Sequence, residues 1–269
     1  MSERRRPRIG LALVVVLSGA FFFLPLLGAA KFGYYTPIKG LTLDPIREVT
    51  KNPKFSADLW LSVRLALATT VASLILMVPT MVWLHLKVPK LRPAAELISI
   101  LPYVIPAIAL VAGASKAFHS AWPFILVNPL GMIPLYVIVA LPFNYRSLDA
   151  GLRAMDLKTL VEASRSLGAG WTKSIVSVVV PNMRTAMLGA SFLTIAVVLG
   201  EYTISALLLH DTFPVFLVQA TGDNPRGGPA LSVLAIVFTW ILLGTVSLLG
   251  RKRKGPKTPD LFFGQEVKT

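Results

Sequence analysis

Long stretches with almost no charged residues constrain how this chain can fold more than any other feature. Each stretch is close to the roughly 20 apolar residues that a helix needs to cross the hydrocarbon core of a bilayer. They predict six transmembrane helices, near residues 9–30, 62–86, 97–116, 123–143, 185–207 and 230–250. Two of them, the third and the fourth, contain more than one proline. Neighbouring helices or polar groups can satisfy the backbone carbonyls that proline frees. We expect kinks at Pro102 and Pro106 in the third helix, and the least regular helix is the fourth, with Pro123, Pro129, Pro134 and Pro142.

Composition supports a membrane protein and excludes several other classes. Hydrophobic residues make up 54% of the 269-residue chain and charged residues 15%, and the mean hydropathy is +0.67. So much apolar surface excludes both a soluble monomer and a disordered chain. The chain has no cysteine, which excludes disulfides, thiolate metal sites and thiol catalysis.

The first apolar run allows two interpretations. It follows a group of arginines and ends in Gly28-Ala29-Ala30, as a cleaved secretory signal would. The apolar part of such signals is usually about 7–15 residues, whereas this run extends from Ile9 to Ala30. Its length favours an uncleaved first helix.

The net charge of +14 and the pI near 10.3 raise the alternative of a nucleic-acid-binding protein. Most of the 27 basic residues, however, fall in segments that would share one side of the membrane: the N-terminus, residues 87–92, residues 146–184 and the tail from Arg251. Basic residues accumulate on the cytoplasmic side, so we expect both termini to be cytoplasmic. Topology then explains the charge, and we expect contacts with membrane lipid and none with nucleic acid.

We expect a single transmembrane domain over residues 1–269, with a core at about 52–250 and a basic C-terminal tail at 251–269. The largest inner segment, residues 144–184, has apolar residues at roughly helical spacing. It should therefore form short amphipathic helices at the inner membrane surface, with a turn at Gly168 and Gly170. A structured inner loop of this kind suggests a docking surface.

One part of that segment carries a distinctive pattern: it reads Glu162-Ala163-Ser164-Arg165-Ser166-Leu167-Gly168-Ala169-Gly170-Trp171, and Val178-Val179-Val180-Pro181 follows. A carboxylate near the start of a short helix suits the helix dipole, small residues let another protein approach closely, and Gly168 permits a sharp turn. The pattern resembles the EAA signature of the permease subunits of binding-protein-dependent type I ABC importers. Ser164 stands where that signature usually has alanine, and serine is small enough for the same packing. A solvated surface helix is the alternative interpretation.

The resemblance implies an all-α integral membrane fold with six transmembrane helices and the type I ABC importer permease (MetI-like) core. It also implies that the segment contains a coupling helix, which fits a groove on a separate ATPase. The coupling residues would be Glu162, Ala163, Ser164, Leu167, Gly168, Ala169 and Pro181. The implied partners are ABC ATPase subunits, a second homologous permease and an extracytoplasmic substrate-binding protein, and the implied location is the bacterial plasma (inner) membrane.

The chain carries no motif for chemistry of its own. A phosphate-binding loop needs Gly-x-x-x-x-Gly-Lys followed by Ser or Thr, and the stretch from Gly168 to Ser174 has Thr172 where the second glycine belongs. The histidines are scattered, which argues against a metal site; they are His85, His119 and His210. We therefore expect a non-catalytic subunit without a cofactor or metal, and we expect the partner ATPase to bind ATP and Mg²⁺.

Glu201 is the one acidic residue that we place inside a predicted helix. An intramembrane carboxylate costs about 2.5–3.5 kcal/mol on insertion scales, so it should face a cavity or a partner. The stretch from Gly200 to Ser205 resembles the fifth-helix region of importers for polyamines, iron and thiamine. The resemblance suggests a substrate path lined by Glu201, Tyr202, Thr203 and Ser205. A hydrogen bond from Glu201 to a neighbouring helix or to the second permease is the alternative, and Arg64 either pairs with Glu201 or, as we favour, extends to the outer interface.

The expected function is ATP-driven import of a small solute through this membrane-spanning subunit. The family branch and Glu201 favour a polyamine such as spermidine or putrescine, with iron, thiamine or an oxyanion as alternatives. A secondary transporter acting alone belongs to a different class, but such folds often carry paired internal repeats, and we find none in this sequence. A non-transporting membrane scaffold would explain the docking segment but not Glu201.

Overall fold

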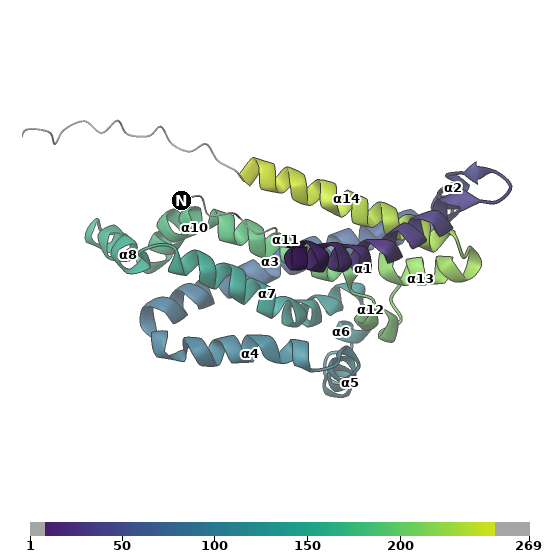
Figure 1. Ribbon diagram of the computed structural model, residues 1–269. Helices are drawn as coiled ribbons and strands as arrows, with labels where there is room; N and C mark the ends of the chain where they lie inside the picture. Colours follow the sequence, from purple (N-terminus) through teal and green to yellow (C-terminus); the bar gives the residue numbers. More distant parts are fainter. Residues whose placement is uncertain (1–8, 251–269) are drawn as a thin grey trace, which may run out of the picture. The chain divides into compact units, whose positions relative to one another are not determined.

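The computed structural model describes residues 9–250, and this part of the chain is almost entirely helical (Figure 1). It divides into two units, of which the first ends at Val233 and the second begins at Leu234, inside helix α14 (Gly227–Gly250). The predicted basic tail at 251–269 lies outside the described residues. The expectation of a helical fold is confirmed for the described part, which adds only a two-stranded hairpin.

The segment between the first two predicted spans contains regular structure. Helix α1 (Ile9–Tyr34) leads into a hairpin of β1 (Tyr35–Thr36) and β2 (Gly40–Leu41), and Gly40 has a φ of +71°, which glycine adopts readily. Helix α2 (Asp44–Thr50) follows.

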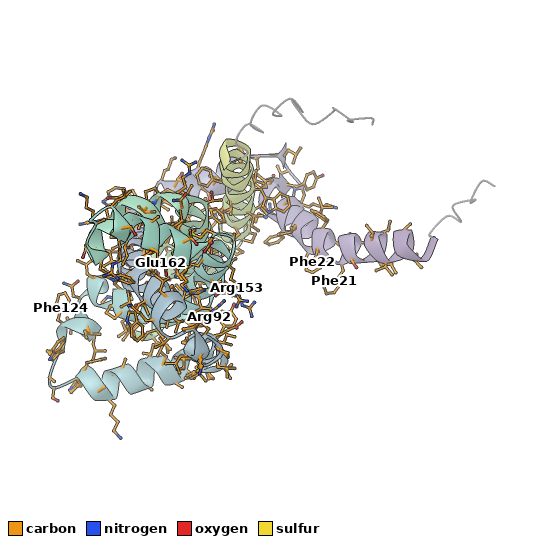
Figure 2. All side chains as sticks on the ribbon, turned by 90° about the vertical axis from the view of Figure 1, so that its left-hand side faces the viewer. Phe21, Phe22, Arg92, Phe124, Arg153 and Glu162 are labelled. Carbon is orange, nitrogen blue, oxygen red and sulfur yellow. The ribbon has the colours of Figure 1, made fainter. Side chains whose placement is uncertain are left out.

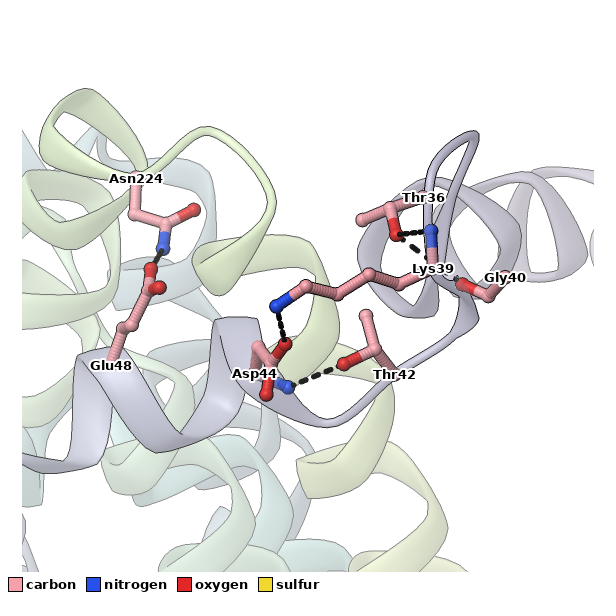
Figure 3. A network of polar contacts seen from close by, with 7 residues as sticks. All are labelled: Thr36, Lys39, Gly40, Thr42, Asp44, Glu48 and Asn224. Carbon is pink, nitrogen blue, oxygen red and sulfur yellow. Dashed lines mark hydrogen bonds and ion pairs between the residues drawn. The ribbon is translucent and has the colours of Figure 1, made fainter.

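Polar contacts hold this segment in place (Figure 3). Lys39 pairs with Asp44 at 2.8 Å, and the Asn224 amide donates a hydrogen bond of 2.7 Å to Glu48 on α2. Asn224 follows helix α13 (Phe213–Asp223), so the contact joins residues far apart in the sequence.

Three helices form the centre of the first unit. Helix α3 (Pro53–Lys87), whose first turn is capped by the Asn52 side chain, packs against α7 (Ile133–Arg153) and α11 (Arg184–Gly200). Two buried apolar clusters lie along them. The inner cluster includes Met81, Leu148, Leu152, Leu157 and Val161. The outer cluster includes Leu65, Met132, Tyr136, Val198 and Ile204.

The predicted third span is broken. Residues 89–91 form the 3₁₀ turn η1 (Pro89–Leu91), and helices α4 (Arg92–Val104) and α5 (Ala107–Phe118) follow, with a bend of 96° between the pair. Proline disfavours helical backbone in the residue before it, and Ile105 is extended, with ψ of 122°. The predicted kink at Pro106 is thereby confirmed, whereas Pro102 lies within α4 without ending it.

The predicted fourth span was placed too early in the sequence. Residues 123–143 do not form one helix: a short helix α6 (Phe124–Val127) and a 3₁₀ turn η2 (Pro129–Met132) precede α7, which runs on to Arg153. Asn128 is extended before Pro129, so the prolines separate these short elements. The apolar composition was recognised correctly, but the helix continues into the segment expected to be a cytoplasmic loop.

Short helices make up the rest of the first unit. The predicted fifth span, 185–207, ends earlier than expected, because α11 stops at Gly200 and α12 (Thr203–Leu207) is a separate turn. Before α11 lie four short elements: α8 (Leu157–Ser166), α9 (Trp171–Ser174), the π-helical η3 (Ile175–Val179) and α10 (Val180–Asn182). In Figure 1, α8 lies at one end of the first unit and α2, α12 and α13 lie at the other.

Two helices of the described part, α1 from Ala12 and α3, are long and apolar enough to cross a membrane. The number rises to four if each bent pair is one span: residues 89–118, and residues 171–200 with a bend of 77°. The count of six and the cytoplasmic position of both termini stay predictions.

Candidate functional site

Helix α8 carries the predicted signature and is built as a distinct amphipathic helix. Asp156 caps its first turn, because its carboxylate accepts hydrogen bonds from the Thr159 hydroxyl at 2.7 Å and the Thr159 amide at 3.2 Å. The same bonds lower the pKa of the Asp156 carboxyl, the hydroxyl bond most strongly. Leu157 and Val161 are buried in the inner cluster. One face of α8 is therefore anchored to the central helices.

The end of α8 is a Schellman motif centred on Gly168. The Gly168 amide donates to the Arg165 carbonyl at 2.9 Å, and the Ala169 amide donates to the Ser164 carbonyl at 3.1 Å. Gly168 adopts a φ of +85°, in the region that favours glycine, as predicted. Leu167, directly before the turn, is 90% exposed. The turn therefore presents a leucine to the surroundings.

Glu162 and Ala163 lie on the open side of α8. The Glu162 side chain is 65% exposed, and its charge contact is with Lys158 at 3.9 Å. Its expected place near the helix N-terminus is wrong: Glu162 lies in the second half of α8, and Asp156 occupies the capping position that benefits from the helix dipole. Figure 2 views the unit from the end that carries α8 and labels Glu162 there.

Ser164 faces inward and not onto the open side of α8, and its role in letting another protein approach closely stays a prediction. It is 8% exposed, and its hydroxyl shares a hydrogen bond of 2.8 Å with the Ser174 hydroxyl. Ser174 also donates to the Gly170 carbonyl at 3.1 Å. A serine at this position thus ties α8 to α9 with a bond that alanine could not make.

Pro181 lies in α10, the last of the short elements between α8 and α11. It is exposed within α10, after a π-helical segment, and the chain bends by 77° before α11 begins. The expectation that one element ends close to Pro181 is met. The structure thus places Glu162 and Ala163 in the second half of α8 and Leu167, Gly168 and Ala169 at the turn that ends it, whereas Ser164 is buried.

The second predicted region is arranged differently from the expectation. Glu201 does not lie inside a helix but follows the last residue of α11 in extended backbone, with ψ of 115°. Its carboxylate accepts hydrogen bonds from the amides of Thr203 at 2.9 Å and Ile204 at 3.0 Å, so it satisfies the first two amides of α12 from the position before the N-cap residue Tyr202. The apolar residues on both sides of Glu201 gave no sign that the helix ends at Gly200. Backbone amides, and not a charged partner, satisfy the Glu201 carboxylate.

The neighbours of Glu201 face different directions. Tyr202 is 41% exposed and Thr203 is exposed, whereas Ser205 is fully buried and shares a hydrogen bond of 2.7 Å with the Tyr136 hydroxyl on α7. Arg64 is exposed, and its side chain makes no ion pair with Glu201. Within residues 9–250, no group of three or more His, Asp or Glu residues could hold a metal ion.

The fold and these two regions can be compared with known proteins. No protein-family model matches the chain. Its sequence is 25% identical over 216 residues to the spermidine/putrescine transport system permease protein PotB of Escherichia coli K12, over 71% of this chain and 77% of that relative. The chain is a homologue of ABC transporter permeases. The predicted family resemblance is thereby confirmed.

Two further matches agree with this family. This chain is 22% identical over 256 residues to the probable ABC transporter permease protein y4fN of Sinorhizobium fredii NGR234. The match covers 89% of this chain but only 45% of that relative. Its fold matches a chain from the crystal structure of an amino acid ABC transporter with a TM-score of 0.53 and 18% identity, over 78% of this chain and 99% of that one. The structural match supports a shared fold.

Proposed function

We propose that the chain is the membrane-spanning subunit of an ATP-driven importer and that α8 with its Gly168 turn docks on a separate ATPase. The observation that carries the proposal is the two-sided construction of α8. Leu157 and Val161 bury one face among the central helices, whereas Glu162 and Leu167 are exposed on the other. A helix anchored in this way can pass a push from outside to α3, α7 and α11.

The docking surface would consist of Glu162, Ala163, Leu167, Gly168 and Ala169. Among residues 9–250, the charge contact of Glu162 is the 3.9 Å pair with Lys158, so in this proposal its carboxylate is available to a basic residue of the ATPase. Leu167 would fill an apolar depression, since a leucine that is 90% exposed gains most by burial in a partner. Ser164 and Pro181 would position this surface without forming part of it. Ser164 would do so through its bond to Ser174, and Pro181 through the bend before α11.

We propose six spans in the bacterial inner membrane with both termini cytoplasmic, and α8 on the cytoplasmic side. The apolar helices α1 and α3 and the two bent pairs support four of these spans, and the distribution of basic residues supports the orientation. The proposed partners are two ATPase copies, a second permease and an extracytoplasmic binding protein. ATP would bind to the ATPases and not to this non-catalytic subunit.

A polyamine is the proposed cargo. The name of the PotB relative and the acidic Glu201 support this choice. In this proposal the exposed side of the α11–α12 break, with Glu201, Tyr202 and Thr203, contacts cargo, and Ser205 supports it through Tyr136. Iron, thiamine and oxyanions are the alternative cargoes to include in a transport assay.

Co-purification in mild detergent tests the proposal. We expect the tagged wild-type chain to retain an ABC ATPase and a second permease, and Glu162→Ala and Gly168→Asp to lose the ATPase. Glu48→Ala and Gly40→Asp are matched controls, because they make the same changes at the opposite end of the unit. A wild-type chain that purifies alone and moves solute in liposomes without ATP would contradict the proposal and indicate a secondary transporter.

A further inference from the structure

A mostly buried carboxylate joins three helices near the end of the unit that carries α8. Asp149 on α7 has a side chain that is only 13% exposed. Its Oδ1 atom lies 2.9 Å from Nε2 of His85 on α3 and 3.3 Å from Nη2 of Arg92 at the start of α4. Its Oδ2 atom lies 2.6 Å from Nε of Arg153, one turn along α7. We refer to these four residues as the Asp149 cluster.

The cluster fixes the start of α4 to α7. Arg92 is held twice, because its guanidinium pairs with Asp149 and its carbonyl accepts a hydrogen bond of 3.0 Å from the Tyr145 hydroxyl. The other side of α4 is open: Leu97 is 69% exposed and Val104 is 73% exposed. Figure 2 labels Arg92 and Arg153, the two arginines of the cluster, near each other at this end of the unit.

The same region is continuous with helices α8 and α9, which we call the docking module. Arg153 ends α7, and α8 begins only a few residues later at Leu157. The end of α3 also touches the module, because the Lys87 ammonium lies 5.6 Å from the ring centre of Trp171, the first residue of α9. A displacement of α8 therefore acts on α7 through the short connection between them, and on the end of α3 through α9, which the Ser164–Ser174 bond ties to α8.

From this geometry we infer that Asp149 is a positioning residue that makes α4 follow α8 when the partner ATPase moves it. Separating α4 from α7 would take the Arg92 guanidinium away from a shielded carboxylate, which would keep its contacts to His85 and Arg153. Losing one partner of a shielded ion pair is unfavourable. The start of α4 and the end of α7 thus move together. The inference rests on the proposed function of α8 as the docking helix.

Spin-label distances can test this inference, since the chain has no cysteine and only introduced cysteines are labelled. In lipid nanodiscs, a label pair at Leu97→Cys and Lys158→Cys reports α4 against α8; the side chains are 69% and 79% exposed. We expect one narrow distance distribution in the wild-type background and in the matched control Asp44→Asn. Asp149→Asn and Arg92→Gln should broaden it, whereas Arg153→Gln should not, because Arg153 belongs to α7 itself.

A narrow distribution in Asp149→Asn, or equal broadening by Arg153→Gln and Arg92→Gln, would overturn the inference. If Asp149→Asn does not fold, Arg92→Gln carries the test, because it leaves the other contacts of Asp149 intact. Asp149→Glu keeps a carboxylate and should give a narrower distribution than Asp149→Asn.

The transmission step is measured in the complex with the ATPase, with and without ATP, from a reference label at Leu41→Cys. We expect residues 97 and 158 to shift together in the wild type, and only residue 158 to shift in Arg92→Gln. A wild-type shift at residue 158 without one at residue 97 would overturn the inferred role of Asp149 but would leave the proposed function of α8 standing. No ATP-dependent shift at residue 158 would overturn the proposed function as well.

Discussion

The glycine at the end of α8 allows a quantitative prediction for Gly168→Ala. An added Cβ would meet no atom within 4 Å, so the substitution changes no packing contact. The φ of +85° must persist, however, because two amides after the helix donate to its last carbonyls. A left-handed conformation costs an L-residue about 1–2 kcal/mol. Alanine also lowers the conformational entropy of the unfolded chain relative to glycine, which offsets about 0.4–1 kcal/mol of this cost.

The net cost is about 1 kcal/mol, which corresponds to a roughly fivefold increase in the equilibrium constant for opening the end of α8. Hydrogen exchange measured by mass spectrometry on a peptide covering residues 157–174 should report it as faster exchange of the Leu167 and Ala169 amides. Gly170→Ala is the matched control, because Gly170 has an ordinary φ of −68° and open space around it. Equal exchange in the two variants would refute the assignment of strain to Gly168.

Three further predictions follow the same reasoning. Leu209 occupies the corresponding position after α12 with a φ of +59° and is 90% exposed, so Leu209→Gly should stabilise that turn by about 0.5–1 kcal/mol and slow hydrogen exchange in residues 203–210. Ser164→Ala removes the bond to Ser174 but leaves the Ser174 bond to Gly170, so thermal unfolding in detergent should show a loss of about 1 kcal/mol, and no loss would contradict the role of that bond. The lowered pKa of Asp156 means that its contribution to α8 is fully present above the ordinary carboxyl range near pH 4 and is lost as pH falls through its folded value; the first α8 amides, with exchange expressed relative to their intrinsic rates at each pH, should therefore lose protection in acid in the wild type but not in Asp156→Asn.

Much of the architecture could be predicted because the features that determine it are local in the sequence. The helical character of the apolar runs, the break at Pro106 and the turn at Gly168 depend on residues within a few positions of each other. The helix limits were harder to predict. Hydropathy places α7 near the right residues, but it cannot show that the helix starts only after Pro129 and continues to Arg153.

The details of the candidate site depend on contacts that no local pattern encodes. The sequence predicts that Glu201 is a charge inside a membrane helix. In the structure α11 ends at Gly200, and the Glu201 carboxylate binds the first amides of α12. Ser164 reads as a small contact residue, yet it turns inward to Ser174. The Asp149 cluster joins residues from 85 to 153, so only the folded chain shows that they meet.

The central claim is that the Gly168 turn of α8 contacts an ABC ATPase, and site-directed cross-linking tests it most directly. A photoreactive maleimide would be attached at Leu167→Cys, with Leu209→Cys as the control, because both leucines are 90% exposed and each follows a short helix, α8 and α12, that Figure 1 shows well apart in the unit. We expect a cross-linked product with an ABC ATPase from position 167 in native membranes, and none from position 209. An ATPase product from position 209 alone, or none from position 167 in a complex that co-purifies with the ATPase, would contradict the account.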